Sequence, residues 1–98
     1  DTKEGGRDMD NHIEIEKANH LIIVHFYGEI DSVMAPVYRG QLSDLIDESE
    51  EDVIFDFQNT SFIDSSGIGL VLGRYNQLKF EHRTLILTGL NPVAYRLF

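Results

Sequence analysis

The segment Val53–Tyr75, VIFDFQNTSFIDSSGIGLVLGRY, contains the pattern that decides the fold. Its first five residues, Val53–Phe57, form a short apolar run of the length and composition typical of a buried parallel strand. Gln58–Ile63 is predicted to be a loop, and a helix is expected from about Ser65 to Phe80. A buried strand followed by a helix is the repeating unit of a parallel sheet, so the segment predicts an α/β fold.

Two more strands are expected before this segment and one after it. His12–Glu16 alternates polar and apolar residues, which indicates an edge strand with one wet face, whereas Leu21–Tyr27 is apolar on both faces. These two strands are predicted to form a hairpin, and Thr84–Thr88 follows the helix as the fourth strand. The expected fold is a mixed four-stranded sheet with one antiparallel edge strand, the rest parallel, and helices packed on it.

A helix is also expected between the second and third strands. Asp31 or Ser32 can cap it, and Pro36 is tolerated only in its first turn. Its apolar face is formed by residues three or four apart: Met34, Val37, Tyr38, Leu42, Leu45 and Ile46. The acidic run Asp47–Asp52 ends the helix and is expected to be solvated and to fray, because negative charge is unfavourable at a helix C-terminus.

The 98 residues are enough for one domain. Residues 1–11 are almost entirely polar and are expected to be disordered or left over from expression, with Met9 as a native start. Asn91 and Pro92 are expected to cap and begin a last helix over residues 93–98. The predicted domain therefore covers residues 12–98.

Composition excludes several classes of function. The formal net charge is −9, with 17 acidic and 8 basic residues, which disfavours nucleic acid and anionic membranes as partners and favours a basic protein. Cysteine is absent, so disulfides and thiolate metal sites are excluded, in keeping with a cytoplasmic protein. No apolar run approaches the roughly 20 residues needed to cross a bilayer.

The residues Asp64-Ser65-Ser66-Gly67 are the first candidates for function, because they follow a buried strand and open a helix. The Ser65 hydroxyl is expected beside free backbone N–H groups and the positive end of the helix dipole, where a phosphate would be tolerated. The alternative is that Asp64 or Ser65 is simply an N-cap, and the residues alone lean toward that interpretation. Two serines and a glycine, however, exceed what capping requires.

Other chemistry is poorly supported. The string from Gly67 to Gly73 has the wrong glycine spacing for a dinucleotide fingerprint, and Arg74 stands where a P-loop would have lysine. We interpret Gly69 and Gly73 as one helix face that permits close approach of a neighbouring backbone. Position 63 is isoleucine, so Ser65 lacks a nucleophile elbow, and the four histidines show no metal-ligand spacing. The sequence predicts neither an enzyme nor a cofactor or metal site.

The fourteen residues Phe62–Tyr75 resemble the central motif of STAS domains (sulfate transporter and anti-sigma factor antagonist), and are most similar to that of the sporulation anti-sigma F factor antagonists. Gly28–Asp31 resembles the family's turn after its second strand, and Asn91–Phe98 resembles the start of its penultimate or last helix. Because family members continue beyond this point, the resemblance implies that the domain is incomplete at its C-terminal end. The resemblance covers residues 12–98 and implies a single STAS domain.

The resemblance also implies a function. In this family the serine after the motif aspartate, here Ser65, is phosphorylated by an anti-sigma factor that is also a serine kinase. The unphosphorylated antagonist binds that factor and releases the sigma factor, phosphorylation abolishes binding, and a serine phosphatase restores it. The implied partner-binding residues are Glu29, Asp31, Asp64, Ser66, Gly67, Ile68 and Gly69. The alternative within the family is a regulatory module of a transporter or a stress-response complex.

Overall fold

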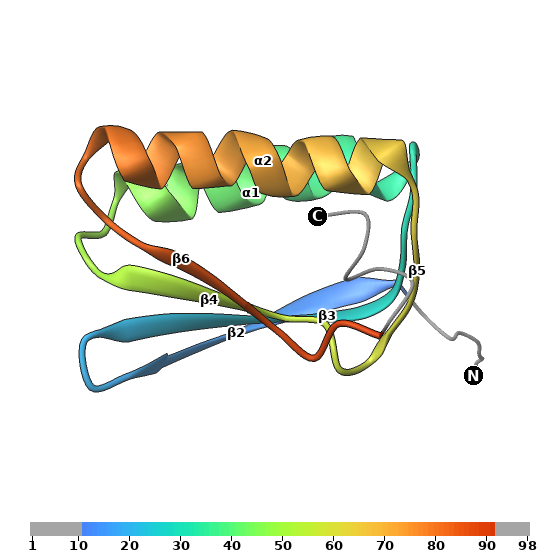
Figure 1. Ribbon diagram of the computed structural model, residues 1–98, viewed down its shortest axis with the longest axis horizontal. Helices are drawn as coiled ribbons and strands as arrows, with labels where there is room; N and C mark the ends of the chain where they lie inside the picture. Colours follow the sequence, from blue (N-terminus) through green and yellow to red (C-terminus); the bar gives the residue numbers. More distant parts are fainter. Residues whose placement is uncertain (1–10, 92–98) are drawn as a thin grey trace.

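The structure, a computed structural model, describes residues 11–91 as a sheet with two helices on one of its faces (Figure 1). The elements are β2 (His12–Ala18), β3 (Leu21–Ile30), α1 (Met34–Asp47), β4 (Asp52–Asp56), β5 (Thr60–Ile63), α2 (Ser65–Phe80) and β6 (Leu85–Thr88). The predictions for residues 1–10 and for the last helix lie outside the described residues. Within residues 11–91, neither helix is long and apolar enough to span a membrane.

The sheet is mixed, as predicted. Its strands follow the order β2-β3-β4-β6, with β2 antiparallel to β3 and the other pairs parallel. The difference from the prediction is β5, a short strand in the stretch predicted to be a loop, which brings the sheet to five strands. It pairs in parallel with the end of β3, through Gly28–Thr60 and Ile30–Ile63.

Backbone geometry at Gly28 explains how β3 pairs with both β4 and β5. The first half of β3 pairs with β4 and its last three residues pair with β5, with a register shift between Gly28 and Glu29. Gly28 has φ +86°, which an L side chain rarely adopts, and its N–H donates to the carbonyl of Asn59. Thr60 then anchors β5 by donating its hydroxyl to the carbonyl of Phe26 at 2.9 Å.

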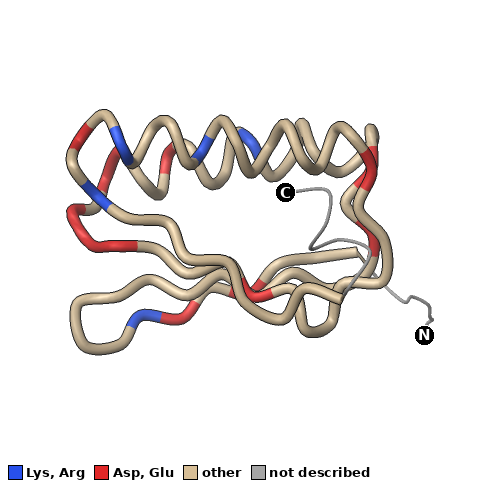
Figure 2. Tube along the Cα trace, viewed as in Figure 1, with Lys and Arg blue, Asp and Glu red and all other residues tan. Residues whose placement is uncertain are grey.

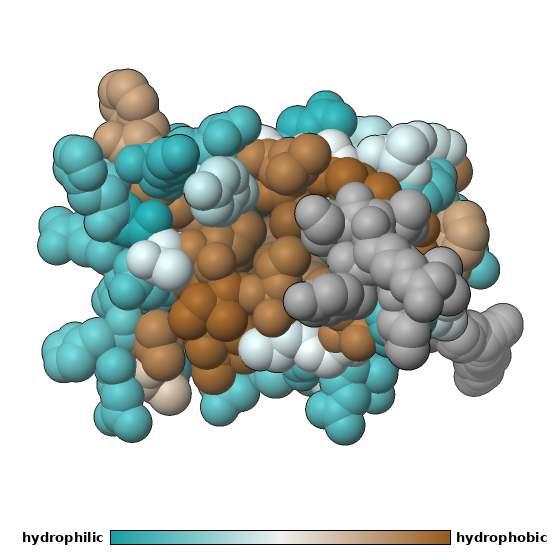
Figure 3. All heavy atoms as spheres, in the orientation of Figure 1, coloured by the Kyte–Doolittle hydropathy of each residue, from teal (hydrophilic) through white to brown (hydrophobic). Residues whose placement is uncertain are grey.

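The core lies between the sheet and the helices. Alternate residues of β3 are buried, and Phe26 contacts the rings of Tyr38, Phe55 and Phe57 at centroid distances of 5.8, 5.0 and 5.1 Å. The predicted face of α1 is largely confirmed, with Tyr38, Leu42 and Ile46 buried, but Val37 is 49% exposed. Figure 3 shows further apolar surface on one face of the molecule. The structure also has a hollow of about 250 Å³ lined by residues of α2 and β6: Val71, Leu72, Tyr75, Leu85 and Leu87.

Arg83 holds the acidic end of α1 in place. Its guanidinium donates to the carbonyls of Ile46 and Glu51, both at 2.8 Å, and to the hydroxyl of Ser49 at 2.9 Å. A cation at a helix C-terminus satisfies carbonyls that have no partner within the helix. The expectation of a fraying, solvated end did not include this contact, which comes from a residue more than 30 positions away.

Candidate partner-binding site at the helix starts

Asp64 is the N-cap of α2. Its backbone is extended, and its Oδ1 accepts hydrogen bonds from the N–H groups of Ser66 at 2.8 Å and Gly67 at 3.1 Å. These are two of the N–H groups that a helix start leaves without intrahelical partners. The capping interpretation is thus confirmed for Asp64. The expectation that N–H groups beside Ser65 are free is wrong for Ser66 and Gly67, because the Asp64 carboxylate already occupies them.

Ser65 is the first residue of α2 and its side chain is exposed, whereas Ser66 is half-buried. Of the two serines, Ser65 is therefore the one that an enzyme can reach more readily. A phosphate on Ser65 would lie beside the Asp64 carboxylate and, without displacing it, could not take the N–H groups of Ser66 and Gly67. Such a phosphate would extend into solvent or into a bound partner.

Gly67 is buried where α2 packs on the end of the sheet. A Cβ atom at this position would lie 2.7 Å from the carbonyl oxygen of Ile30 and 2.7 Å from Cγ2 of Ile63. The predicted close approach at Gly69 and Gly73 is wrong, since a Cβ at either position would meet nothing within 4 Å. The glycine that the packing requires is Gly67, and it fixes the height of the helix start above the sheet.

Asp31 lies three residues before Met34, the first residue of α1, and accepts N–H groups there as Asp64 does at the start of α2. Its Oδ1 accepts hydrogen bonds from the N–H groups of Val33 and Met34, both at 3.0 Å. Of the two predicted caps, Asp31 rather than Ser32 makes these bonds. Both helices therefore start from an aspartate that follows a strand.

Strand pairing brings the predicted residues together. Ile30 pairs with Ile63, and the Asp64 N–H donates to the Ile30 carbonyl at 3.3 Å, so the two aspartates lie at the same end of the sheet. Glu29, which is exposed, pairs with Phe62 in the same ladder. The remaining predicted residues lie within the first turns of α2: Ser66, Gly67, Ile68 and Gly69. The structure thus places all of them at or near one end of the molecule.

This end of the described chain has acidic side chains and no basic ones. Figure 2 shows Asp and Glu at the starts of the helices, whereas Lys and Arg lie further along the helices or at the opposite end. The acidic residues there are Glu29, Asp31 and Asp64. The surface around Ser65 is therefore negative before any phosphate is added.

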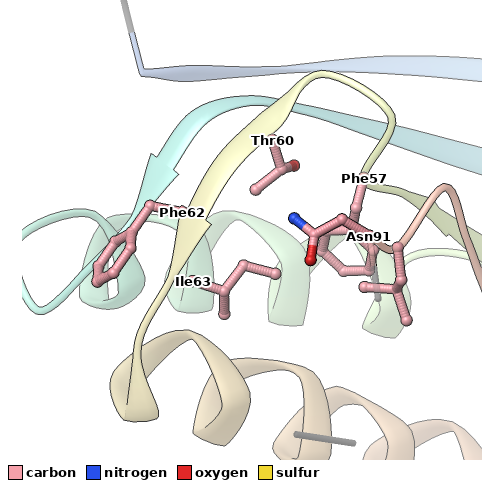
Figure 4. A pocket seen from close by; sticks show the side chains of 6 residues that line it. Phe57, Thr60, Phe62, Ile63 and Asn91 are labelled. Carbon is pink, nitrogen blue, oxygen red and sulfur yellow. The ribbon is translucent and has the colours of Figure 1, made fainter. Parts of the chain in front are cut away.

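A hollow lies beside β5 (Figure 4). It encloses only about 20 Å³ and is lined by Phe57, Thr60, Phe62, Ile63, Leu90 and Asn91. This volume is below the roughly 300–1,000 Å³ usual for small-molecule sites. The Phe62 ring points away from the other lining side chains and is 51% exposed. The hollow is thus a poor candidate for a cofactor site, and Phe62 belongs to the outer surface.

Sequence reasoning missed a hydrogen-bonded cluster on the sheet face that the helices leave open. His25 Nδ1 lies 2.8 Å from Asp56 Oδ2, and Nε2 lies 3.0 Å from Glu16 Oε1. The bonds to Glu16 and Asp56 raise the pKa of His25, against a smaller effect of burial. Burial acts to raise the pKa of Asp56, but its hydrogen bonds to His25 and to the Gln58 N–H lower it overall.

A polar residue in each of two apolar strands, His25 and Asp56, was the available signal for this cluster. Parallel pairing of β3 with β4 sets His25 opposite Asp56. Within residues 11–91, no group of three or more histidines and carboxylates is placed to bind a metal ion. The cluster joins three strands, and its two hydrogen bonds occupy both ring nitrogens of His25.

A small α/β domain with an exposed serine at a capped, acidic helix start matches a known family. Residues 12–98 match the STAS domain, and the chain belongs to this family. It is 31% identical over 90 residues to the anti-sigma F factor antagonist of Paenibacillus polymyxa, covering 91% of this chain and 77% of that protein. It is 30% identical to the anti-sigma-B factor antagonist of Bacillus subtilis, covering 92% of this chain and 82% of that protein.

Solved structures agree with this relationship. The unphosphorylated form of the anti-sigma factor antagonist SpoIIAA superposes with a TM-score of 0.77 at 29% identity, covering 89% of this chain and 81% of that one. The phosphorylated form of SpoIIAA gives a TM-score of 0.76 at 29% identity, covering 89% and 80%. The two forms resemble this fold equally well.

Proposed function

We propose that this protein is an anti-sigma factor antagonist controlled by phosphorylation of Ser65. The unphosphorylated form binds an anti-sigma factor that is also a serine kinase and thereby releases a sigma factor. Transfer of the ATP γ-phosphate to the Ser65 hydroxyl abolishes this binding, and a serine phosphatase reverses it by hydrolysis. The protein acts in the cytoplasm by binding rather than by catalysis.

The observation that carries the proposal is the exposed Ser65 hydroxyl at a helix start where Asp64 already accepts the N–H groups of Ser66 and Gly67. A kinase can reach the hydroxyl without unfolding the domain, and the added charge of about −1.5 to −2 has no ready partner within the fold. The relatives named as anti-sigma factor antagonists support the choice of partner. The equal likeness to both forms of SpoIIAA supports a fold that tolerates the phosphate.

The test uses the purified chain and each anti-sigma factor with a serine kinase domain encoded in the same genome. One of them should bind the chain and, with ATP, add a single phosphate that intact-mass analysis detects. Ser65→Ala should abolish labelling, whereas Ser66→Ala, the matched control, should keep it. The proposal fails if no kinase binds the chain, or if the Ser65→Ala variant is labelled like the original.

The two kinds of relative differ in the sigma factor that their binding releases. The matched proteins are named for antagonism of anti-sigma F and of anti-sigma-B factors at nearly equal identity, 31% and 30%. We assign the chain to the sporulation class on its central motif. Preferential binding to a stress-response anti-sigma factor, measured against the sporulation factor side by side, would move it to the other class.

A further inference from the structure

Three exposed apolar side chains lie close to the acidic helix starts. Val33 is 71% exposed and Val37 is 49% exposed, one helical turn apart at the start of α1. Phe62, 51% exposed, lies in β5 next to Glu29. We call these three residues the apolar rim. Val33 comes two residues after the cap Asp31, and Phe62 comes two residues before the cap Asp64, so the chain places apolar surface beside both carboxylates.

We propose that the apolar rim closes over Ser65 in the complex with the anti-sigma factor, and that phosphorylation breaks the complex because a phosphate cannot be desolvated inside this seal. The proposal rests on the function proposed above and adds its mechanism. The partner that fits is a protein surface with an apolar recess bordered by lysine or arginine side chains, which complement Glu29 and Asp31.

Exposure on the free protein is the first argument. Burial of an exposed aromatic ring and two exposed valines in a partner is favourable, because it removes their apolar surface from contact with water. Aromatic anchors near the centre of an interface carry a large share of binding energy. Phe62 is well suited to this role because pairing with β3 fixes its backbone and its ring points outward (Figure 4).

The second argument concerns the phosphate. A buried dianion is tolerated only if donors replace its hydration. At this helix start the N–H groups of Ser66 and Gly67 are engaged by Asp64, and the neighbouring carboxylate repels the added charge. Apolar neighbours offer no donors. Basic side chains of the partner, placed at the border to meet Glu29 and Asp31, remain outside the apolar centre.

The test measures affinity for the anti-sigma factor with and without phosphate on Ser65. Phe62→Ser should weaken binding of the unphosphorylated protein about tenfold, which corresponds to about 1.4 kcal/mol. It should also reduce the loss of affinity on phosphorylation, because the apolar rim no longer excludes water from Ser65. Phe62→Leu, which stays apolar, should retain most of the affinity and rule out a loss through misfolding.

Phe80→Ser is the matched control. Phe80 is 87% exposed at the far end of α2, so the same change there should leave both affinities unaltered. If Phe62→Ser bound the anti-sigma factor as tightly as the unsubstituted protein, the inference would be overturned while the proposed function stayed intact. The inference would also be overturned if Phe62→Ser left unchanged the ratio of affinities between the unphosphorylated and the phosphorylated protein. Absence of binding by the unmodified chain would instead overturn the proposed function and the inference with it.

Discussion

Asp31 and Asp64 occupy equivalent places in two neighbouring strand–helix connections. Each directly follows one member of the Ile30–Ile63 pair, and each accepts two backbone N–H groups through Oδ1. Because α1 and α2 lie side by side, two carboxylates are fixed at the same end of the domain (Figure 1). Ser65 is therefore displayed on an acidic surface whose carboxylates are held in place by the backbone.

Replacing the cap tests how firmly this surface is held. Asp64→Ala removes the acceptor for two N–H groups and should lower the free energy of unfolding by about 1 kcal/mol. Asp64→Asn keeps a cap oxygen and should cost less. Urea denaturation of the three proteins measures both differences. If the alanine variant and the unsubstituted protein had the same free energy of unfolding, water would be replacing the cap at no cost in stability.

Gly67 and Gly73 should respond to alanine in opposite directions. Gly67→Ala places a Cβ 2.7 Å from the Ile30 carbonyl oxygen, so it should destabilise the fold by about 1–3 kcal/mol. Gly73→Ala, on the same helix, meets no atom within 4 Å and should stabilise the helix by up to about 1 kcal/mol. Thermal unfolding of the pair is the measurement, and a stabilising Gly67→Ala would contradict the packing described for α2.

The sequence predicted most of the elements because their apolar periods are strong. It also located the start of α2, since Asp64 followed by two serines and a glycine is a local signal. The short strand β5 was missed because Thr60 and Ser61 are common in loops and its pairing depends on a bulge at the distant Gly28. Local patterns do not contain this kind of information.

The glycines of the site also show that local sequence patterns do not reveal tertiary packing. Gly69 and Gly73 are four residues apart, which suggested a packing face, yet the helix turns that face away from the core. Which glycine is buried depends on where the sheet ends, at Ile30 and Ile63, and spacing along one helix cannot reveal it. The rim of exposed apolar residues likewise emerges only once α1 and β5 are placed in space.

A negative charge on Ser65 should leave the fold almost as stable as before. The positive end of α2 favours an anion, but Asp64 already occupies the adjacent N–H groups, so the gain and the repulsion largely cancel. We expect Ser65→Glu to change the free energy of unfolding by less than about 0.5 kcal/mol. Chemical denaturation tests this, and a large loss would mean that phosphorylation acts by unfolding the site.

His25 should make stability depend on pH. Its pKa is raised in the folded state by the bonds to Glu16 and Asp56, so its contribution is fully present below the unfolded value of 6.5. That contribution is lost as pH rises through the raised folded pKa. The difference in melting temperature between the unsubstituted protein and His25→Gln should therefore be largest below pH 6.5 and should shrink as the pH rises above that value. His82→Gln, at an exposed turn, is the control, and a constant difference for His25→Gln would contradict the prediction.

Arg83 should contribute more to stability than any exposed cation among residues 11–91. Its side chain is 7% exposed and donates to Ile46, Ser49 and Glu51, which together form the end of α1 and the approach to β4. Arg83→Ala leaves two part-buried carbonyls without this donor and should lower the free energy of unfolding by about 2–4 kcal/mol. Lysine cannot reproduce the planar fork, so Arg83→Lys should recover only part of the loss. Lys79→Ala, at an exposed position of α2, should cost far less in the same urea titration; equal losses at the two positions would mean that Arg83 stabilises the fold through charge alone.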